Sequence, residues 1–192
     1  MKIRSFIAIN FPVATTRRIA EEIGKLSEEA RTVGHDIAWV PAANLHLTMK
    51  FLGMIEEESV AAIVSRLQRE LVARTPFELE ARGIGVFPEG ATPRVLWAGV
   101  KASQALGLLQ QDLERWLAET GFPREPRAFH PHVTIGRVKT VGTTPLAPLV
   151  QSRSELVLGS GRATELVVYE SRTRRSGSEY IALGRVAIGN AS

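Results

Sequence analysis

Two stretches of this chain alternate apolar and polar side chains, LHLTMKFLG at residues 45–53 and HVTIGR at residues 132–137. Such alternation predicts β-strands that bury one face of a sheet and leave the other face open. For the first strand, alternation assigns an apolar face with Leu45, Leu47, Met49 and Phe51 and a polar face with Asn44, His46, Thr48 and Lys50. In the second strand, Val133 and Ile135 are the expected buried positions, and His132 and Thr134 lie opposite. Each strand is therefore expected to present one histidine and one threonine on the open face.

The sequence around the two His-x-Thr strands repeats as well. A predicted strand at residues 3–9 and a helix at residues 15–31 precede the first motif, and a strand at residues 94–100 and a helix capped by Ser103 precede the second. The other expected elements are a helix at residues 60–71 and strands at residues 37–40, 77–81, 155–158, 164–170 and 180–186. Because no linker-like composition separates the halves, residues 1–192 are expected to form one α+β domain whose two lobes face each other across a groove.

The repeat suggests a chemical reason for two histidines. One His-x-Thr tripeptide indicates little, since polar residues are ordinary on the open face of an antiparallel sheet. Two of them suit the cleavage of a phosphodiester, in which one group takes a proton from the attacking oxygen and another protonates the leaving oxygen. Imidazole can perform either task near neutral pH, and a threonine hydroxyl can donate to a phosphate oxygen. The pair therefore indicates acid–base chemistry on a phosphate ester.

The composition excludes several other kinds of site. The chain has no cysteine, so disulfides, thiolate metal ligands and cysteine nucleophiles are excluded. Its four histidines lack the His-Glu-x-x-His spacing of a zinc-binding helix, so we expect neither a metal nor another cofactor. The 24 basic residues exceed the 20 acidic ones and give a pI near 9.8, which favours an anionic partner. The apolar run at residues 6–9 is too short for a signal peptide or a membrane span, so we expect a cytoplasmic protein without membrane contact. We also expect a monomer.

HLTMKFLG and FHPHVTIGR resemble the paired His-x-Thr motifs of the two-histidine (2H) phosphoesterases. RSFIAINFP, PRVLWAGV and ELVVYESRTRRSGSEYIAL are similar to segments of one branch, the RNA 2′,3′-cyclic phosphodiesterases, also called 2′-5′ RNA ligases or LigT-like proteins. The resemblance covers nearly the whole chain. It implies a bilobal α+β fold with two pseudo-twofold-related antiparallel-sheet lobes, outer helices and a central groove. The implied activity is metal-independent hydrolysis of 2′,3′-cyclic phosphates, at RNA ends or on nucleotides, to 2′-phosphomonoesters.

The same resemblance implies a role for each motif residue. His46 would be the proton donor to the departing O3′, and His132 would be the proton acceptor that activates water. Thr48 and Thr134 would bind the phosphate oxygens. The sequence around the two histidines does not distinguish the acid from the base, so this assignment rests on the resemblance.

Arg137 matches a family arginine near the phosphate, but alternation along the strand raises an objection. Residues 132, 134 and 136 share a face, so Arg137 should point inward unless Gly136 permits a bulge or a twist. The phosphate role requires such an irregularity. Pairing with a carboxylate at the edge of the core is the alternative.

Several other residues carry two interpretations each. Phe11 and Lys50 are candidates for nucleotide contact, although a phenylalanine at a strand end commonly belongs to the core. His130 is expected to be a solvent-facing turn residue before Pro131, and His35 a surface residue. The arginines at residues 172–175 could guide an RNA backbone or belong to a solvated hairpin loop.

Three alternatives to hydrolysis of RNA cyclic phosphates stay open. A 5′-hydroxyl in place of water would give 2′-5′ ligation in the same site. A small cyclic nucleotide, such as an ADP-ribose cyclic phosphate, could replace the RNA end. Finally, the protein could be a nucleotide- or RNA-binding module in which the histidines bind phosphate without catalysis. In that case no cyclic substrate would be turned over.

Overall fold

Nine strands join into one continuous sheet in the computed structural model, which describes residues 1–90, 92–142, 144–174 and 177–189. The strands are β1 (Lys2–Ile9), β2 (Asp36–Trp39), β3 (Leu47–Glu56), β4 (Phe77–Phe87), β5 (Val95–Val100), β6 (His132–Thr140), β7 (Val157–Ala163), β8 (Glu165–Arg174) and β9 (Gly177–Ala187). The helices are α1 (Val13–Thr32), the 3-10 turn η1 (Ala42–Asn44), α2 (Ser59–Leu71), α3 (Gln104–Ala118) and α4 (Ala147–Gln151). None of the described helices has the length and apolar character needed to cross a membrane.

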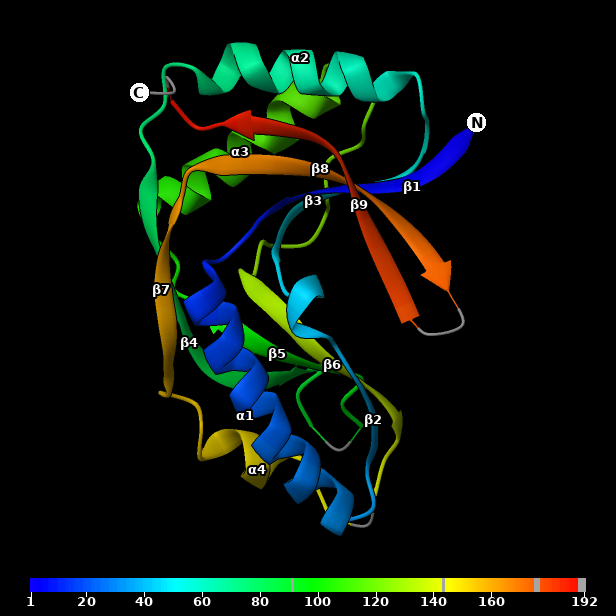
Figure 1. Ribbon diagram of the computed structural model, residues 1–192, viewed down its shortest axis with the longest axis vertical. Helices are drawn as coiled ribbons and strands as arrows, with labels where there is room; N and C mark the ends of the chain where they lie inside the picture. The colour runs from blue at the N-terminus through cyan, green and yellow to red at the C-terminus, as the bar shows by residue number, and fades with distance from the viewer. Residues whose placement is uncertain (91, 143, 175–176, 190–192) are drawn as a thin grey trace.

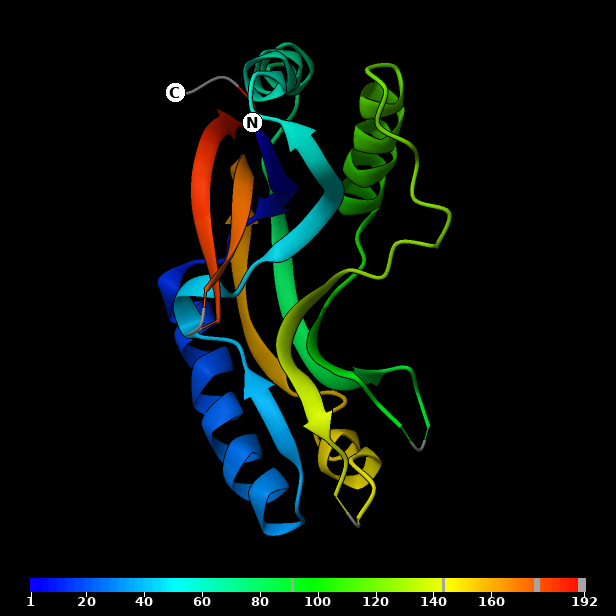
Figure 2. The ribbon, with the colours of Figure 1, turned by 90° about the vertical axis from the view of Figure 1, so that its right-hand side faces the viewer.

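The sheet consists of two lobes joined at one point. Its strand order is β7-β4-β5-β6-β3-β1-β8-β9, with β2 paired to β6, and every pairing is antiparallel. Strands β3 and β6 meet through the single pair Leu47 and Val133, which are the central residues of the two His-x-Thr motifs. Figure 2 shows the sheet curling along its length. The expected α+β fold with two lobes is confirmed, with the two halves of the sheet continuous through β3 and β6.

Each lobe is covered by a helix that the other lobe supplies. Helix α1 follows β1 but packs against β2 and β7, and α3 follows β5 but packs against β3. Figure 1 shows α2 and α3 together at one end of the molecule and α1 and α4 at the other. Leu106, Leu109 and Leu113 of α3 recur at helical spacing and are buried, and Ser103 caps its first turn by accepting a hydrogen bond from the amide of Leu106 at 3.2 Å.

A β-bulge follows the threonine in both His-x-Thr strands. Across β3 and β1, Thr48 pairs with Ala8 and Lys50 with Ile7, which leaves Met49 without a partner. Across β6 and β5, Thr134 pairs with Trp97 and Gly136 with Leu96, which leaves Ile135 without a partner. An extra residue reverses the alternation beyond it. The bulge therefore belongs to the internal repeat. Beyond the bulge, the residues that each strand exposes are not the ones that strict alternation predicts.

The bulges correct the expected faces of both strands. Phe51, expected in the apolar face, is 63% exposed, whereas Lys50, expected in the polar face, is only 5% exposed. In β6 the buried residue after the bulge is Gly136, where a β-carbon would lie 2.8 Å from the Ile37 side chain and 3.0 Å from the Trp39 ring. A side chain at residue 136 would therefore clash with β2.

The C-terminal part contains more strand than its composition suggests. The sequence predicts strands only at residues 164–170 and 180–186 with a hairpin loop between them, but β8 continues to Arg174 and β9 begins at Gly177. Cross-strand pairs such as Arg172 with Glu179 extend the hairpin because they place opposite charges beside each other. Arg172 also binds Glu170 at 2.7 Å, and Arg174 binds Glu179 at 2.9 Å, which favours a solvated hairpin. Arg175 lies outside the described residues.

Candidate active site

The pairing of β3 with β6 brings the two His-x-Thr motifs together on one face of the sheet. Leu47 faces Val133, and both are completely buried. Continuing this antiparallel register places His46 across from Thr134 and Thr48 across from His132, on the opposite face. We call this face, which carries His46, Thr48, His132 and Thr134, the histidine face. Leu47 and Val133 thus face each other as equivalent residues, and each histidine faces the threonine of the other repeat, as a pseudo-twofold axis between β3 and β6 requires.

Both imidazole rings are oriented by a backbone carbonyl two residues earlier. His46 Nδ1 lies 2.7 Å from the carbonyl oxygen of Asn44, and His132 Nδ1 lies 2.7 Å from that of His130. Because a carbonyl oxygen only accepts, Nδ1 carries the hydrogen in both rings. Nε2 is then the nitrogen that gains or loses a proton, and in His46 it lies 3.1 Å from the hydroxyl oxygen of Thr48.

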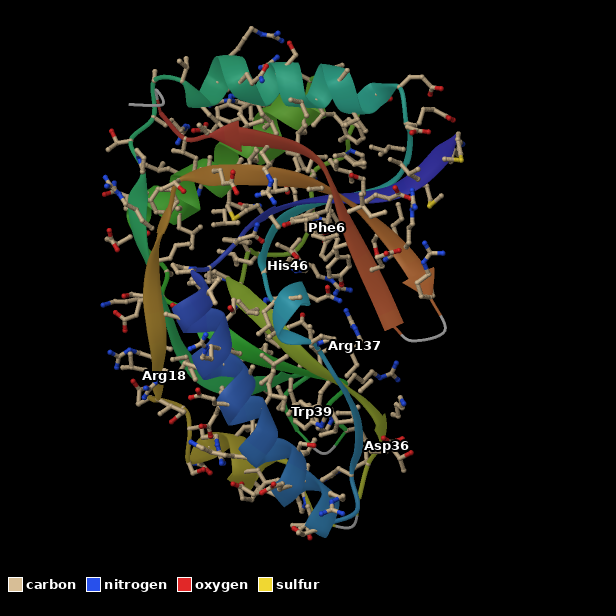
Figure 3. All side chains as sticks on the ribbon, in the orientation of Figure 1. Phe6, Arg18, Asp36, Trp39, His46 and Arg137 are labelled. Atoms are coloured by element: carbon tan, nitrogen blue, oxygen red, sulfur yellow. The ribbon has the colours of Figure 1, made fainter. Side chains whose placement is uncertain are left out.

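Aromatic rings surround His46. Phe6 stacks on its imidazole with ring centroids 4.8 Å apart, and Tyr180 meets it edge-on at 5.1 Å. Figure 3 shows Phe6 beside His46. His46, Tyr169 and Tyr180 also line a pocket of about 190 Å³ together with Asn10, Leu45 and Arg185. Burial among these groups lowers the pKa of His46 below its ordinary value, the carbonyl of Asn44 partly offsets this, and the charge of His132 lowers the pKa further.

His132 has a different environment on the other side of the site. One aromatic ring, Phe87, meets it edge-on at 5.3 Å. Burial lowers the pKa of His132, the hydrogen bond to the carbonyl of His130 raises it, and the positive charges of His130 and Arg137 lower it again. The two histidines therefore both favour the neutral form, but only His46 is enclosed by several aromatic rings.

Arg137 lies on the histidine face because of the bulge at Ile135. It pairs with Val95, as Thr134 pairs with Trp97, so Arg137 and Thr134 point to the same side of the sheet. The side chain is exposed, Figure 3 shows it below His46, and its charge acts on His132. No carboxylate among the described residues forms an ion pair with Arg137. The described residues thus offer no support for a carboxylate partner, and the exposed guanidinium is available to an anion on this face.

Four other expectations from the sequence meet different outcomes. Phe11 is 7% exposed and belongs to the hydrophobic core, so it is not placed for nucleotide contact. The prediction that Lys50 contacts the nucleotide is also wrong, because the bulge turns its side chain inward to Glu114 at 2.7 Å.

His35 is expected at the surface but is only 6% exposed. Its Nδ1 accepts a hydrogen bond from the amide of Gly142 at 2.7 Å, and its Nε2 donates to the carbonyl of Thr144. The side chain of His130 is exposed as expected, although its carbonyl orients His132.

The sequence did not single out three aromatic residues of this site. Phe6 and Tyr180 enclose His46 from strands that are distant in sequence, and Phe51 reaches the histidine face only through the bulge at Met49. Phe51 lies 6.4 Å from Phe6, ring centre to ring centre. By register it is the counterpart of Arg137 in the other repeat. Only the second bulge had a signal in the sequence, the glycine at residue 136.

The assembled residues can exchange protons with a bound anion. Two imidazoles present Nε2, two hydroxyls lie beside them, and one guanidinium adds a positive charge. Among the described residues, no cluster of three or more histidine, aspartate or glutamate side chains could hold a metal ion. The arrangement suits acid–base chemistry at a phosphate group.

Comparison with known proteins gives one consistent family. The family model described as the 2′-5′ RNA ligase superfamily matches residues 16–174. A curated RNA 2′,3′-cyclic phosphodiesterase of Methanothermobacter thermautotrophicus is 30% identical over 94% of this chain and 96% of its own length. One from Aeropyrum pernix is 32% identical over 85% of this chain and 95% of its own.

Solved structures agree with these sequence relatives. The crystal structure of E. coli LigT complexed with 3′-AMP has a TM-score of 0.78 at 27% identity, covering 99% of this chain and all of the other. The crystal structure of TT0787 of Thermus thermophilus has a TM-score of 0.76 at 25% identity, covering 98% of this chain and all of the other. By sequence, by fold and by the paired His-x-Thr strands, the chain belongs to the 2′-5′ RNA ligase superfamily.

Proposed function

We propose that this protein hydrolyses 2′,3′-cyclic phosphodiesters, at RNA ends or on nucleotides, to 2′-phosphomonoesters without a metal ion. The observation that carries the proposal is the pair of imidazoles on one face, each with Nδ1 fixed by a carbonyl and Nε2 presented for proton transfer. The names of the relatives support the substrate class, since those proteins are RNA 2′,3′-cyclic phosphodiesterases.

In the proposed reaction, the cyclic phosphate lies between the two histidines. Nε2 of His132 takes a proton from a water molecule, whose oxygen attacks phosphorus. The bond from phosphorus to O3′ breaks as O3′ receives the proton from Nε2 of His46, and the phosphate remains on O2′. The hydroxyls of Thr48 and Thr134 and the guanidinium of Arg137 stabilise the charge on the non-bridging oxygens.

The unequal surroundings of the histidines support this division of roles. O3′ belongs to the ribose, so the nucleoside must lie on the side of the general acid. His46 is the histidine with several aromatic neighbours, and Phe51 extends this aromatic surface from the same strand. At the equivalent position the other repeat has Arg137, which can bind phosphate but offers no ring. The substrate orientation that fits both the aromatic surface and Arg137 places the nucleobase toward β3 and the phosphate toward Arg137.

Replacement of Phe51 by leucine tests this orientation. We expect the KM for adenosine 2′,3′-cyclic phosphate to rise about fivefold or more, because base–aromatic stacking contributes about 1–3 kcal/mol. The KM for ribose 2′,3′-cyclic phosphate, which has no base, should not change. Met54→Leu is the matched control, since Met54 is 63% exposed on the same strand. Equal KM changes for both substrates would place the base elsewhere.

Turnover of a cyclic nucleotide in excess EDTA tests the function itself. Purified protein should convert adenosine 2′,3′-cyclic phosphate to adenosine 2′-phosphate, with the isomer identified by chromatography or phosphorus NMR. Activity only with added metal, or release of the 3′-phosphate, would contradict the mechanism. Absence of product from every cyclic substrate, RNA ends and ADP-ribose cyclic phosphate included, would favour a binding module. An RNA with a 5′-hydroxyl in the same assay measures the 2′-5′ ligation that shares these residues.

A further inference from the structure

A buried ion pair lies directly behind the histidine face. Lys50 Nζ is 2.7 Å from Glu114 Oε2, and the two residues are 5% and 9% exposed. Lys50 reaches this position because it follows the bulge at Met49, two residues after Thr48. Glu114 belongs to α3, which packs against β3. The ion pair thus connects the first His-x-Thr strand to the helix that precedes the second.

The same two side chains hold the segment that leads into the second strand. Lys50 Nζ donates to the carbonyl oxygen of Pro123 at 2.6 Å, and the amide of Glu125 donates to Glu114 Oε2 at 3.0 Å. Residues 122–131 contain neither helix nor strand, and most of them are exposed. The segment ends at His130 and Pro131, immediately before His132. Lys50 and Glu114 bind it near its start, and at its end the amide of Val100 donates to the carbonyl of Pro131 at 3.0 Å, so the carbonyl of His130 lies between these two attachments.

Charge is needed here for geometry more than for stability. Removing two charges from water costs several kcal/mol each, so a buried ion pair is commonly no more stabilising than a well-packed apolar pair. An apolar pair, however, could bind neither the carbonyl of Pro123 nor the amide of Glu125. The directional bonds fix two backbone groups that would otherwise lack these partners.

We propose that Lys50 and Glu114 are positioning residues, which couple the two His-x-Thr strands by fixing residues 122–131 and thereby the orientation of His132. This inference rests on the proposed function for its kinetic consequence but not for its structural one. When the segment shifts, the carbonyl of His130 moves away from Nδ1 of His132. The hydrogen then no longer stays on Nδ1, and Nε2 is less often free to accept a proton from water.

The first test removes both charges together, as Lys50→Met with Glu114→Leu. We expect kcat for adenosine 2′,3′-cyclic phosphate to fall about tenfold or more with little change in KM, because small displacements of a catalytic group are costly. Nitrogen-15 NMR of the His132 ring should show a mixture of tautomers in place of hydrogen on Nδ1 alone. The control is Arg153→Met with Glu22→Leu, a partly buried ion pair at 2.5 Å between α1 and the residues after α4, which should leave kcat and the tautomer unchanged.

The second test leaves the buried pair intact and removes one bond from the segment. Glu125→Pro deletes the amide hydrogen that binds Glu114, whereas Glu125→Ala keeps it. The proline variant should lower kcat about fivefold or more and change the tautomer of His132, and the alanine variant should do neither. This comparison decides the matter if the double variant does not fold. Wild-type kcat and an unchanged tautomer in the charge-free and proline variants would overturn the proposal, and the tautomer can be measured even if the protein hydrolyses no cyclic phosphate.

Discussion

His46→Ala and His132→Ala should each lower kcat for adenosine 2′,3′-cyclic phosphate by at least about 100-fold, the usual contribution of general acid–base catalysis. Each variant removes one of the two Nε2 atoms that the proposed reaction requires. Each should still fold, since both rings lie on the open side of the sheet while the strands are anchored by Leu47 and Val133. Steady-state kinetics and thermal unfolding of the two variants measure these effects.

The double variant His46→Ala with His132→Ala sharpens this result. One proton transfer without the other accelerates the reaction little. The loss of kcat in the double variant should therefore be about as large as in either single variant, and smaller than the product of the two single losses. His130→Ala is the control, as its exposed side chain can be removed while its carbonyl still binds Nδ1 of His132. Near-wild-type activity in either single histidine variant would refute the assignment of an acid–base pair.

The sequence predicted the site well up to the threonine of each motif and poorly beyond it. Alternation correctly placed Leu47 and Val133 in the core and the histidines and threonines on the open face. It misplaced Phe51 and Lys50, since the bulge at Met49 depends on the pairing of β3 with β1, a contact that local periodicity does not contain. For Arg137 the glycine before it signalled the irregularity, and the structure has it at Ile135.

Long-range contacts explain the other differences. His35 follows the glycine that ends α1 and looks like a loop residue, but it is buried because its ring binds the backbone of Gly142 and Thr144, more than a hundred residues later. The aromatic surroundings of His46 come from β1, β8 and β9. Only the pairing of strands that are distant in sequence brings those rings to the first motif. The difference between the two histidines, which the motifs treat alike, therefore arises at the level of the sheet.

The two histidines differ in their aromatic surroundings, but the pKa of each is shifted in the same direction. A pH profile of the rate should show this common shift. Burial lowers the pKa of both histidines below the ordinary value of 6.5. The base must be neutral and the acid protonated, so kcat/KM should fall about tenfold per pH unit on each side of an optimum below pH 6.5. A bound phosphate anion stabilises both protonated rings and raises their pKa values. The optimum of kcat should therefore lie at higher pH than that of kcat/KM, measured without metal across pH 4.5–9.

Unfolding provides a check on these pKa shifts that needs no activity. A histidine whose pKa is lowered in the folded protein binds its proton more readily in the unfolded chain. As the pH falls from 6.5 toward the folded-state pKa values, the unfolding free energy should therefore decrease, and below those values the two histidines should add no further change. In His46→Ala the decrease over this range should be smaller than in the wild type. An equal decrease in both proteins would mean that the pKa of His46 is not lowered, and the optimum of kcat/KM should then lie at a higher pH than a lowered pKa gives.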